Sequence, residues 1–371
     1  MIMETPNNNS RRSVALDALR GFTIIAMIIV NDPGSWDHVY PPLLHADWNG
    51  VTPTDYIFPF FLFIVGVSIV LAYDKRTADG ADRQALLKKA GGRALKIYGV
   101  GLFLWLFPGF DFTSIRWVGV LQRIAFVFLP CALLYLYTDW RTWLRIGVSL
   151  LVGYWIVMAF LPVPGIGSPD LSAPMKNWAH YLDGLLLPGY LWQKTWDPEG
   201  LLSTLPAIAT GISGMLAGRL MLDVKDPYHK VAWLSGAGFL LFTLGGVWSW
   251  FFPYNKPIWS SSYVLHTSGL AMMALGVCYL LVDVKGYVRW TRPGLIFGAN
   301  AITAYVLASL LTAVFYNGFG DFPGLNAVWV DGLSATGLDP RLASLLYALL
   351  YVLIIFVPVY GLYRKRVFIK L

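Results

Sequence analysis

Long apolar stretches constrain what this 371-residue chain can fold into more than any other feature. Each is close to the ~20 residues that an α-helix needs to cross ~30 Å of hydrocarbon, where backbone N–H and C=O groups must be satisfied within the segment. They cover residues 13–31, 54–73, 93–108, 117–137, 142–161, 201–221, 231–252, 260–282, 294–316 and 341–363. Hydrophobic residues make up 57% of the chain and charged residues 13%, unlike a soluble domain. The sequence therefore predicts an all-α, polytopic membrane protein with about ten transmembrane helices.

The apolar stretches follow one another without a separate soluble domain or a recognisable internal repeat. We therefore expect a single transmembrane domain over residues 13–366, with a polar N-terminal tail (1–12) and a short C-terminal tail (367–371). Three longer loops on one side of the membrane, at about 32–53, 162–200 and 317–340, are the places where a site could be built outside the lipid.

The distribution of Lys and Arg predicts the orientation. The chain has 28 Lys and Arg against 21 Asp and Glu, a net charge of +7. Most of these cations lie in loops on the side of the N-terminus, and the opposite loops hold only Arg116, Lys176, Lys194, Lys256 and Arg341. Because cytoplasmic loops carry the excess of Lys and Arg, both termini are expected to be cytoplasmic. The topology explains the basic excess, so no nucleic-acid partner is expected.

The largest basic cluster runs from Lys75 to Lys96, in a loop on the predicted cytoplasmic side. Such a cluster is expected to meet anionic membrane lipids. The alternative is that it meets the phosphates of a cytoplasmic cosubstrate.

Asp17 and Arg20 lie within the first predicted span, three residues apart and therefore on one helix face. Ionisable groups inside a bilayer are costly and are candidates for a functional site. Two interpretations are open. The pair could fix helix packing, or Arg20 could reach a phosphate or carboxylate of a ligand that enters from the cytoplasm.

Other polar residues lie within later spans. Gln122 and Arg123 are in the outer half of the fourth, where Arg123 could hold an anionic oxygen in a bidentate contact or pair with a backbone carbonyl or a carboxylate. Ser262 and His266 lie in the eighth span and Asn300 in the ninth. These three could belong to a ligand site or could only form hydrogen bonds between helices.

His45 lies in the polar loop between the first two spans. An imidazole is suited to general-base chemistry near neutral pH. Asp47, Asn49 and Asp55 are close enough in sequence to orient the ring or to position a nucleophile. A lone histidine in a loop is often only solvated, so the residues alone leave its role open.

Asp197 and Glu199 stand immediately before the sixth span. They could stabilise the N-terminus of that helix through its dipole, or line the external mouth of a site. The loop before them is rich in aromatic residues, which form either a membrane-interface belt or a platform for a sugar. Cys131 and Cys278 fall inside spans without metal-ligand spacing, so no metal is expected.

Several of these residues belong to short motifs that, in order, resemble the heparan-α-glucosaminide N-acetyltransferase family and its bacterial relatives. The matching segments are 17–21 (DALRG), Asn31, 45–50 (HADWNG), Asp55 with 58–59 (FP), 119–123 (GVLQR), 197–200 (DPEG) and 255–260 (NKPIWS). The first segment is also similar to the wider membrane acyltransferase-3 group. The resemblance extends over nearly the whole chain.

The resemblance implies an integral membrane enzyme that takes acetyl-CoA from the cytoplasm and acetylates an amino sugar on the far side. In that family the histidine matching His45 is catalytic and the asparagine matching Asn31 belongs to the same site. Lysosomal members carry a luminal domain and a further span ahead of the core, which we do not expect for this chain. We therefore expect a bacterial inner-membrane protein, and a homodimer would be compatible with the family.

A working hypothesis follows for each candidate residue. His45 would act as a general base or as a transient acetyl carrier, with Asn31 in the same site. Candidates to orient groups or stabilise an oxyanion are Arg123, Gln122, Asp47 and Asp55. Acetyl-CoA would bind among Arg20, Asp17, Asn300, Ser262 and His266. The acceptor would bind among Glu199, Asp197, Trp48 and Asn49. The alternative function is a transporter of a sugar or a CoA-derived product through the same cavity.

Overall fold

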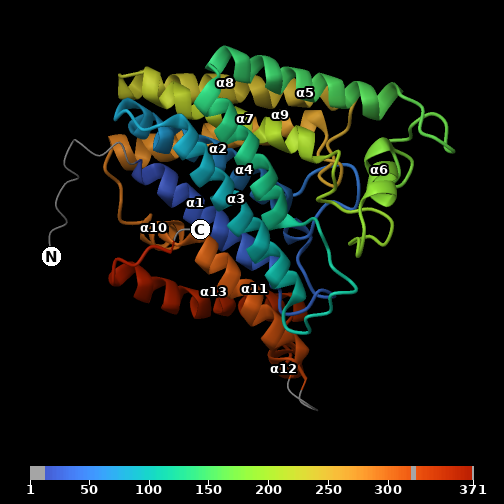
Figure 1. Ribbon diagram of the computed structural model, residues 1–371. Coiled ribbons are helices and arrows are strands. Elements are labelled where there is room, and N and C mark those ends of the chain that lie inside the picture. The colour runs from blue at the N-terminus through green and yellow to red at the C-terminus, as the bar shows by residue number, and fades with distance from the viewer. Residues whose placement is uncertain (1–12, 319–322, 370–371) are drawn as a thin grey trace.

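The computed structural model describes residues 13–318 and 323–369. The predicted N-terminal tail, residues 319–322 of the third long loop and residues 370–371 lie outside the described part. Within it the chain is helical, and the only β-type pairings are two isolated bridges (Figure 1). The α-helices are α1 Val14–Asn31, α2 Ile57–Ala78, α3 Arg83–Leu106, α4 Val120–Tyr137, α5 Trp140–Phe160, α6 Trp178–Leu186, α7 Thr204–Asp223, α8 Pro227–Trp248, α9 Ser261–Cys278, α10 Arg292–Ala299, α11 Ala301–Asn317, α12 Leu325–Ala335 and α13 Pro340–Arg364.

Three short helical segments complete the described fold. Two 3-10 helices, η1 Pro41–Leu43 and η2 Pro53–Tyr56, lie in the loop before α2, and η2 continues directly into α2. A π-helical turn, η3 Tyr279–Val284, extends α9. The predicted loop at 162–200 contains α6, and the predicted loop at 317–340 contains α12.

Eight of the described helices are long and apolar enough to cross a membrane, which confirms the all-α membrane fold. They are α1, α2 together with η2, α4, α5, α7, α8, α9 together with η3, and α13. A ninth span is formed if α10 and α11 are counted together, although they bend by 83°. The predicted third span, 93–108, is the second half of α3. Because α3 begins at Arg83 and its first half carries several Lys and Arg, the helix is less apolar than the others.

Local sequence explains where many of the helices begin. Polar side chains accept hydrogen bonds from backbone N–H groups that have no partner in the first helical turn. Residues that do this are Ser13 for α1, Asp82 for α3, Asp139 for α5, Asn177 for α6, Asp226 for α8 and Asp339 for α13.

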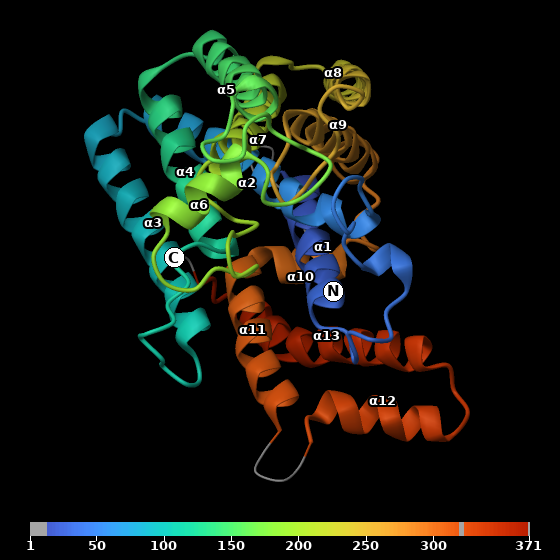
Figure 2. The ribbon, with the colours of Figure 1, turned by 90° about the vertical axis from the view of Figure 1, so that its right-hand side faces the viewer.

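Glycine residues allow two central helix pairs to cross closely. A Cβ at Gly66 of α2 would lie 2.0 Å from the carbonyl oxygen of Gly211 on α7, and a Cβ at Gly21 of α1 would lie 1.7 Å from that of Gly294 on α10. Neither position has room for a side chain, as is common where membrane helices approach each other. In Figures 1 and 2, α11, α12 and α13 lie on one side of α1, and α2, α4, α5 and α7 lie on the other.

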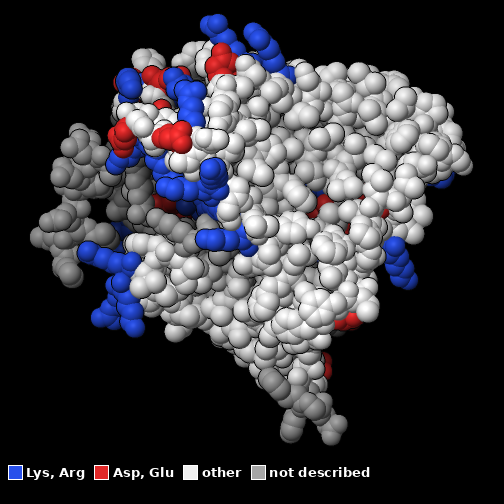
Figure 3. Space-filling view, in the orientation of Figure 1, with Lys and Arg blue, Asp and Glu red and all other residues white. Residues whose placement is uncertain are grey.

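Charged residues are distributed unevenly over the surface. Lys and Arg gather at one end of the helix bundle, and most of the visible face beyond them is uncharged (Figure 3). This is the end at which α1 begins (Figure 1). The pattern agrees with an apolar belt for the lipid and with the orientation predicted from the loops, which stays a prediction.

Candidate active site

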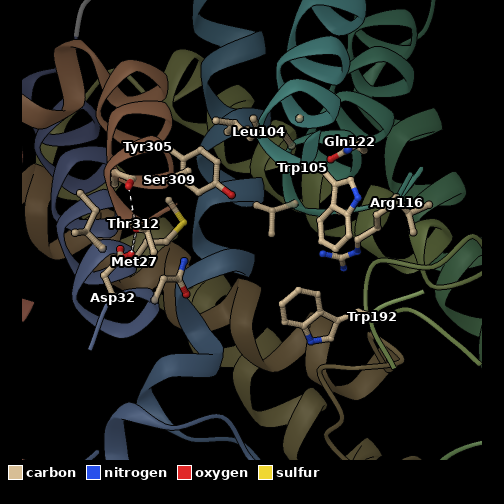
Figure 4. Close-up of a pocket in the computed structure, with 18 residues that line it drawn as sticks. Met27, Asp32, Leu104, Trp105, Arg116, Gln122, Trp192, Tyr305, Ser309 and Thr312 are labelled. Atoms are coloured by element: carbon tan, nitrogen blue, oxygen red, sulfur yellow. Dashed lines mark hydrogen bonds between the residues drawn. The ribbon is translucent and has the colours of Figure 1, made fainter. Parts of the chain in front are cut away.

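A cavity of about 360 Å³ lies between α1, α3, α4 and α11 (Figure 4). Its polar and aromatic walls are formed by Asn31, Asp32, Trp105, Arg116, Gln122, Trp192, Tyr305, Ser309 and Thr312. Its size is near the lower end of the ~300–1,000 Å³ typical of sites for drug-sized ligands. Because α1 ends at Asn31, the cavity is remote from the basic end, where α1 begins.

Gln122 reaches the cavity because the neighbouring helix has a glycine there. A Cβ at Gly101 of α3 would lie 2.5 Å from Oε1 of Gln122. The small residue therefore lets the buried amide of Gln122 lie in the wall between α3 and α4.

Arg116 connects the cavity wall to the 197–200 segment. Its Nε and Nη2 atoms donate to the two carboxylate oxygens of Asp197 at 2.7 and 2.6 Å, and Nη2 also donates to Oε2 of Glu199 at 2.6 Å. Burial lowers the pKa of Arg116, but the two carboxylates outweigh it and raise the pKa overall. The guanidinium also lies over the ring of Trp192, 5.0 Å from its centroid. This cluster gives both predicted acceptor carboxylates a cationic partner.

Arg123 holds the same segment from the interior. Its Nη2 donates to the carbonyl oxygen of Gly200 at 3.0 Å and to Oγ of Ser203 at 2.5 Å, and the guanidinium lies over the ring of Trp259. Arg123 is 1% exposed and does not line the cavity. Of the alternatives considered from the sequence, the contact with a backbone carbonyl is the one observed.

His45 lies in a polar cluster with Asp55 and Lys256. Its Nδ1 is 2.7 Å from Oδ1 of Asp55, and Nζ of Lys256 is 3.0 Å from both ring nitrogens of His45. Asp55 is buried and also accepts hydrogen bonds from the backbone N–H groups of Ala46 and Thr52. The His45 side chain remains 49% exposed. Asp55 therefore fixes the imidazole while leaving much of the ring accessible.

Lys256 links this cluster to the cavity wall by charge. Burial lowers the pKa of Lys256 overall, although Asp55 and Glu199 both act to raise it. Glu199 is in turn bound to Arg116, which lines the cavity. His45 is not part of the cavity wall, but charged side chains connect the two places.

The other residues of the 45–50 segment have different partners. Nε1 of Trp48 and Nδ2 of Asn49 both donate to the carbonyl oxygen of Leu171, and Oδ1 of Asn49 accepts from Nδ2 of the buried Asn255. The ring of Trp48 also packs edge-on against Trp196. Asp47 is exposed. These contacts hold the His45 loop against the loop before α6 and the segment before α9.

The predicted acetyl-CoA residues do not meet in one place. Nη1 of Arg20 donates to Oδ1 of Asp17 at 3.0 Å. His266 lies between two tyrosine hydroxyls at 2.9 Å, and Ser262 donates to a backbone carbonyl. Asn300, at the bend between α10 and α11, binds backbone atoms of the C-terminal segment. None of the five lines the 360 Å³ cavity, so their role in cosubstrate binding stays a prediction.

The family model described as the catalytic part of heparan-alpha-glucosaminide N-acetyltransferase matches residues 12–239, more than half of the chain. The chain belongs to this family. Relatives named heparan-alpha-glucosaminide N-acetyltransferase are 27% identical over 426 residues in Mus musculus and 31% identical over 350 residues in Homo sapiens. These matches cover 99% and 79% of this chain, but only 62% and 52% of the relatives.

Three residues of the assembled site were not singled out from the sequence. Asp32 follows Asn31, Arg116 was counted only for topology, and Lys256 lies in the 255–260 motif. Their position next to or within family motifs was the available signal. Among the described residues, no group of three or more His, Cys, Asp or Glu could hold a metal ion.

Proposed function

We propose that this protein is a transmembrane acetyltransferase of a bacterial inner membrane. It transfers the acetyl group of cytoplasmic acetyl-CoA to the amine of a glucosamine-type sugar or glycan at the external side. Family membership supports the activity, and the relatives' names support the amino-sugar acceptor. The structural observation that carries the proposal is the polar cavity at the end of α1, whose wall contains Asn31.

The chemistry follows from the groups around this cavity. Acetyl transfer forms a bond between the amine nitrogen and the carbonyl carbon and breaks the bond from that carbon to sulfur. The sulfur leaves as a thiolate, which takes up a proton to become the CoA thiol, and the nitrogen gives up one proton. With Nδ1–H of His45 donated to Asp55, Nε2 is the nitrogen that can take this proton. In the proposed mechanism the amine displaces Lys256 from Nε2 of the half-exposed His45, while Nδ1 stays bonded to Asp55. The amide of Asn31 donates to the oxyanion that develops on the thioester carbonyl.

The cavity is too small for a whole acetyl-CoA together with a sugar. In the proposal it holds only the thioester end of acetyl-CoA and the amine-bearing part of the acceptor. The nucleotide would lie toward the basic end, near Arg20. A covalent acetyl-histidine is the competing mechanism. Rapid-quench analysis without acceptor distinguishes them, because only the covalent route places labelled acetyl on the protein. Lipid contacts and a homodimer complete the proposal as predictions.

The test is acceptor-dependent release of CoA thiol by purified protein supplied with acetyl-CoA and glucosamine. Loss of a general base typically costs ~10²–10⁴-fold, so His45→Ala should reduce release by that amount while acetyl-CoA still binds. His229→Ala is the matched control, because His229 also pairs with an aspartate but is 77% exposed and lies on α8. It should behave as the wild type.

Two outcomes would overturn the proposal. If His45→Ala releases thiol at the wild-type rate, His45 has no part in the chemical step. If the wild type moves a sugar or CoA-derived solute across proteoliposomes without consuming thioester, the protein is a transporter instead.

A further inference from the structure

Asp32 differs from the other buried aspartates of the described chain. Asp17 pairs with Arg20, Asp55 with His45 and Asp197 with Arg116. Asp183 accepts from two backbone N–H groups, those of Asp197 and Leu201. Each of these four carboxylates therefore has a cationic partner or several N–H donors, which is what a buried charge requires.

Asp32 has neither kind of partner. It is 5% exposed, and the hydrogen bond to its carboxylate comes from the hydroxyl of Thr312 (Figure 4). Among the described residues, no Lys or Arg forms an ion pair with Asp32. Its other close neighbours are tyrosines of α11 and α13, namely Tyr316, Tyr347 and Tyr351. Burial raises the pKa of Asp32 to about 7, while the bond from Thr312 lowers it. A cation bound beside this carboxylate would favour its charged form.

A cation bound in the cavity can reach the carboxylate of Asp32. This residue lines the 360 Å³ cavity and follows Asn31 in the chain. Trp105 and Trp192 lie across the cavity from it (Figure 4). Arg116 covers one face of Trp192 and so holds this ring in place. Aromatic faces attract cations and the apolar faces of small ligands.

We propose that Asp32 binds the ammonium group of the acceptor sugar and that the cavity is the acceptor subsite. This proposal rests on the proposed function. The CoA phosphates are anionic and would be repelled by Asp32. The carboxylate therefore favours binding of the acceptor's ammonium group over binding of the CoA phosphates. Asp32 is a specificity residue in this scheme, because no bond forms or breaks on it. The bound ammonium must still lose a proton to solvent water before its nitrogen attacks the thioester, and the second proton of the nitrogen then passes to Nε2 of His45.

The test compares glucosamine with glucose, which lacks the amine, in calorimetric titrations of purified protein without acetyl-CoA. The wild type should bind glucosamine at least 10-fold more tightly. Asp32→Asn keeps the shape but removes the charge, so it should abolish this preference. It should also raise the acceptor KM by about 10- to 100-fold and leave the acetyl-CoA KM unchanged, since a hydrogen bond to a charged group is lost.

Two further variants control for general damage. Asp32→Glu keeps the charge and should keep a preference for glucosamine. Asp331→Asn removes an exposed carboxylate from α12, which does not line the cavity, and should leave both KM values unchanged.

The possible outcomes separate this inference from the proposed function. An acceptor KM within twofold of wild type in Asp32→Asn overturns the role of Asp32 and leaves acetyl transfer standing. If wild type consumes no acetyl-CoA with any amine, the proposed function fails, but loss of the glucosamine preference in Asp32→Asn would still support an ammonium site. A wild type that binds glucosamine and glucose equally overturns the inference whether or not the variants fold.

Discussion

At the scale of single residues, a pair of arginines holds the 197–200 segment beside the cavity. Arg116 binds the side chains of Asp197 and Glu199, and Arg123 binds the backbone of the same segment. The planar guanidinium of Arg116 donates from two nitrogens to the two oxygens of Asp197, a bidentate geometry that a lysine ammonium cannot reproduce. The 197–200 segment is therefore held in place by geometry as well as by charge.

We predict that Arg116→Lys lowers the free energy of unfolding by about 1–3 kcal/mol, because the buried carboxylate of Asp197 and the partly buried one of Glu199 lose part of their hydrogen bonding. Thermal unfolding in detergent measures the change. Arg219→Lys is the matched control, since Arg219 contacts Asp223 through the same atoms but both side chains are 40% exposed or more. An exposed pair contributes little, so this variant should change stability by less than ~0.5 kcal/mol. Equal losses in the two variants would contradict the prediction.

At the scale of elements, the crossing of α2 and α7 depends on glycine. Gly66 faces the backbone of Gly211, and a Cβ at Gly214 would lie 2.0 Å from the carbonyl oxygen of Phe63. Since α7 carries the 197–200 segment at its start and α2 follows Asp55, their packing sets the distance between the two halves of the site. Helix contact at this crossing therefore positions Glu199 relative to His45.

We expect Gly66→Ala to reduce stability by about 1–3 kcal/mol, because the added methyl group forces the two backbones apart. It should also slow CoA release. Gly153→Ala on α5 has the same chemistry, but nothing lies within 4 Å of the new methyl group. That variant should be neutral or slightly stabilising, as alanine favours a helix. Thermal unfolding of both variants measures the change in stability. If Gly66→Ala is as stable as the wild type, the two helices can move apart without loss of stability, which would contradict the prediction.

At the scale of the whole molecule, charge separates two ends. The basic residues gather where α1 begins, and the cavity lies where α1 ends (Figures 1 and 3). In the proposed function the cosubstrate and the acceptor come from opposite sides of the membrane. We therefore predict that the cavity faces the external side.

Cysteine labelling tests this orientation. Ser168→Cys lies in the exposed loop before α6, and Ala81→Cys lies in the exposed turn between α2 and α3. We predict that a membrane-impermeant maleimide labels Ser168→Cys in intact cells and labels Ala81→Cys only after permeabilisation. Wild type is the background control, because Cys131 is buried and Cys278 is partly buried. The reverse pattern would invert the topology and with it the sidedness of the proposed reaction.

The sequence by itself determined the membrane-spanning class, most of the helices and the motifs from which the site is built. These are local properties. Hydrophobic length decides which segments enter the lipid, and residues such as Asp82 and Asp139 cap the helices that begin directly after them. His45 and Asp55 were also within reach of sequence reasoning, because only 10 positions separate them. The predicted third span, 93–108, corresponds to the apolar second half of α3. The helix itself begins earlier, at Arg83, because the basic first half is continuous with it.

The tertiary structure alone decided which distant residues meet. Arg116 and Asp197 are 81 positions apart, and Lys256 and His45 are 211 positions apart. Neither pairing follows from hydropathy or spacing, because both depend on how helices pack through contacts such as Gly66 with Gly211. The same packing encloses the cavity and leaves Asp32 in its wall without a cationic partner among the described residues. Burial and neighbours, which only the folded chain provides, turn this ordinary aspartate into a candidate binding group.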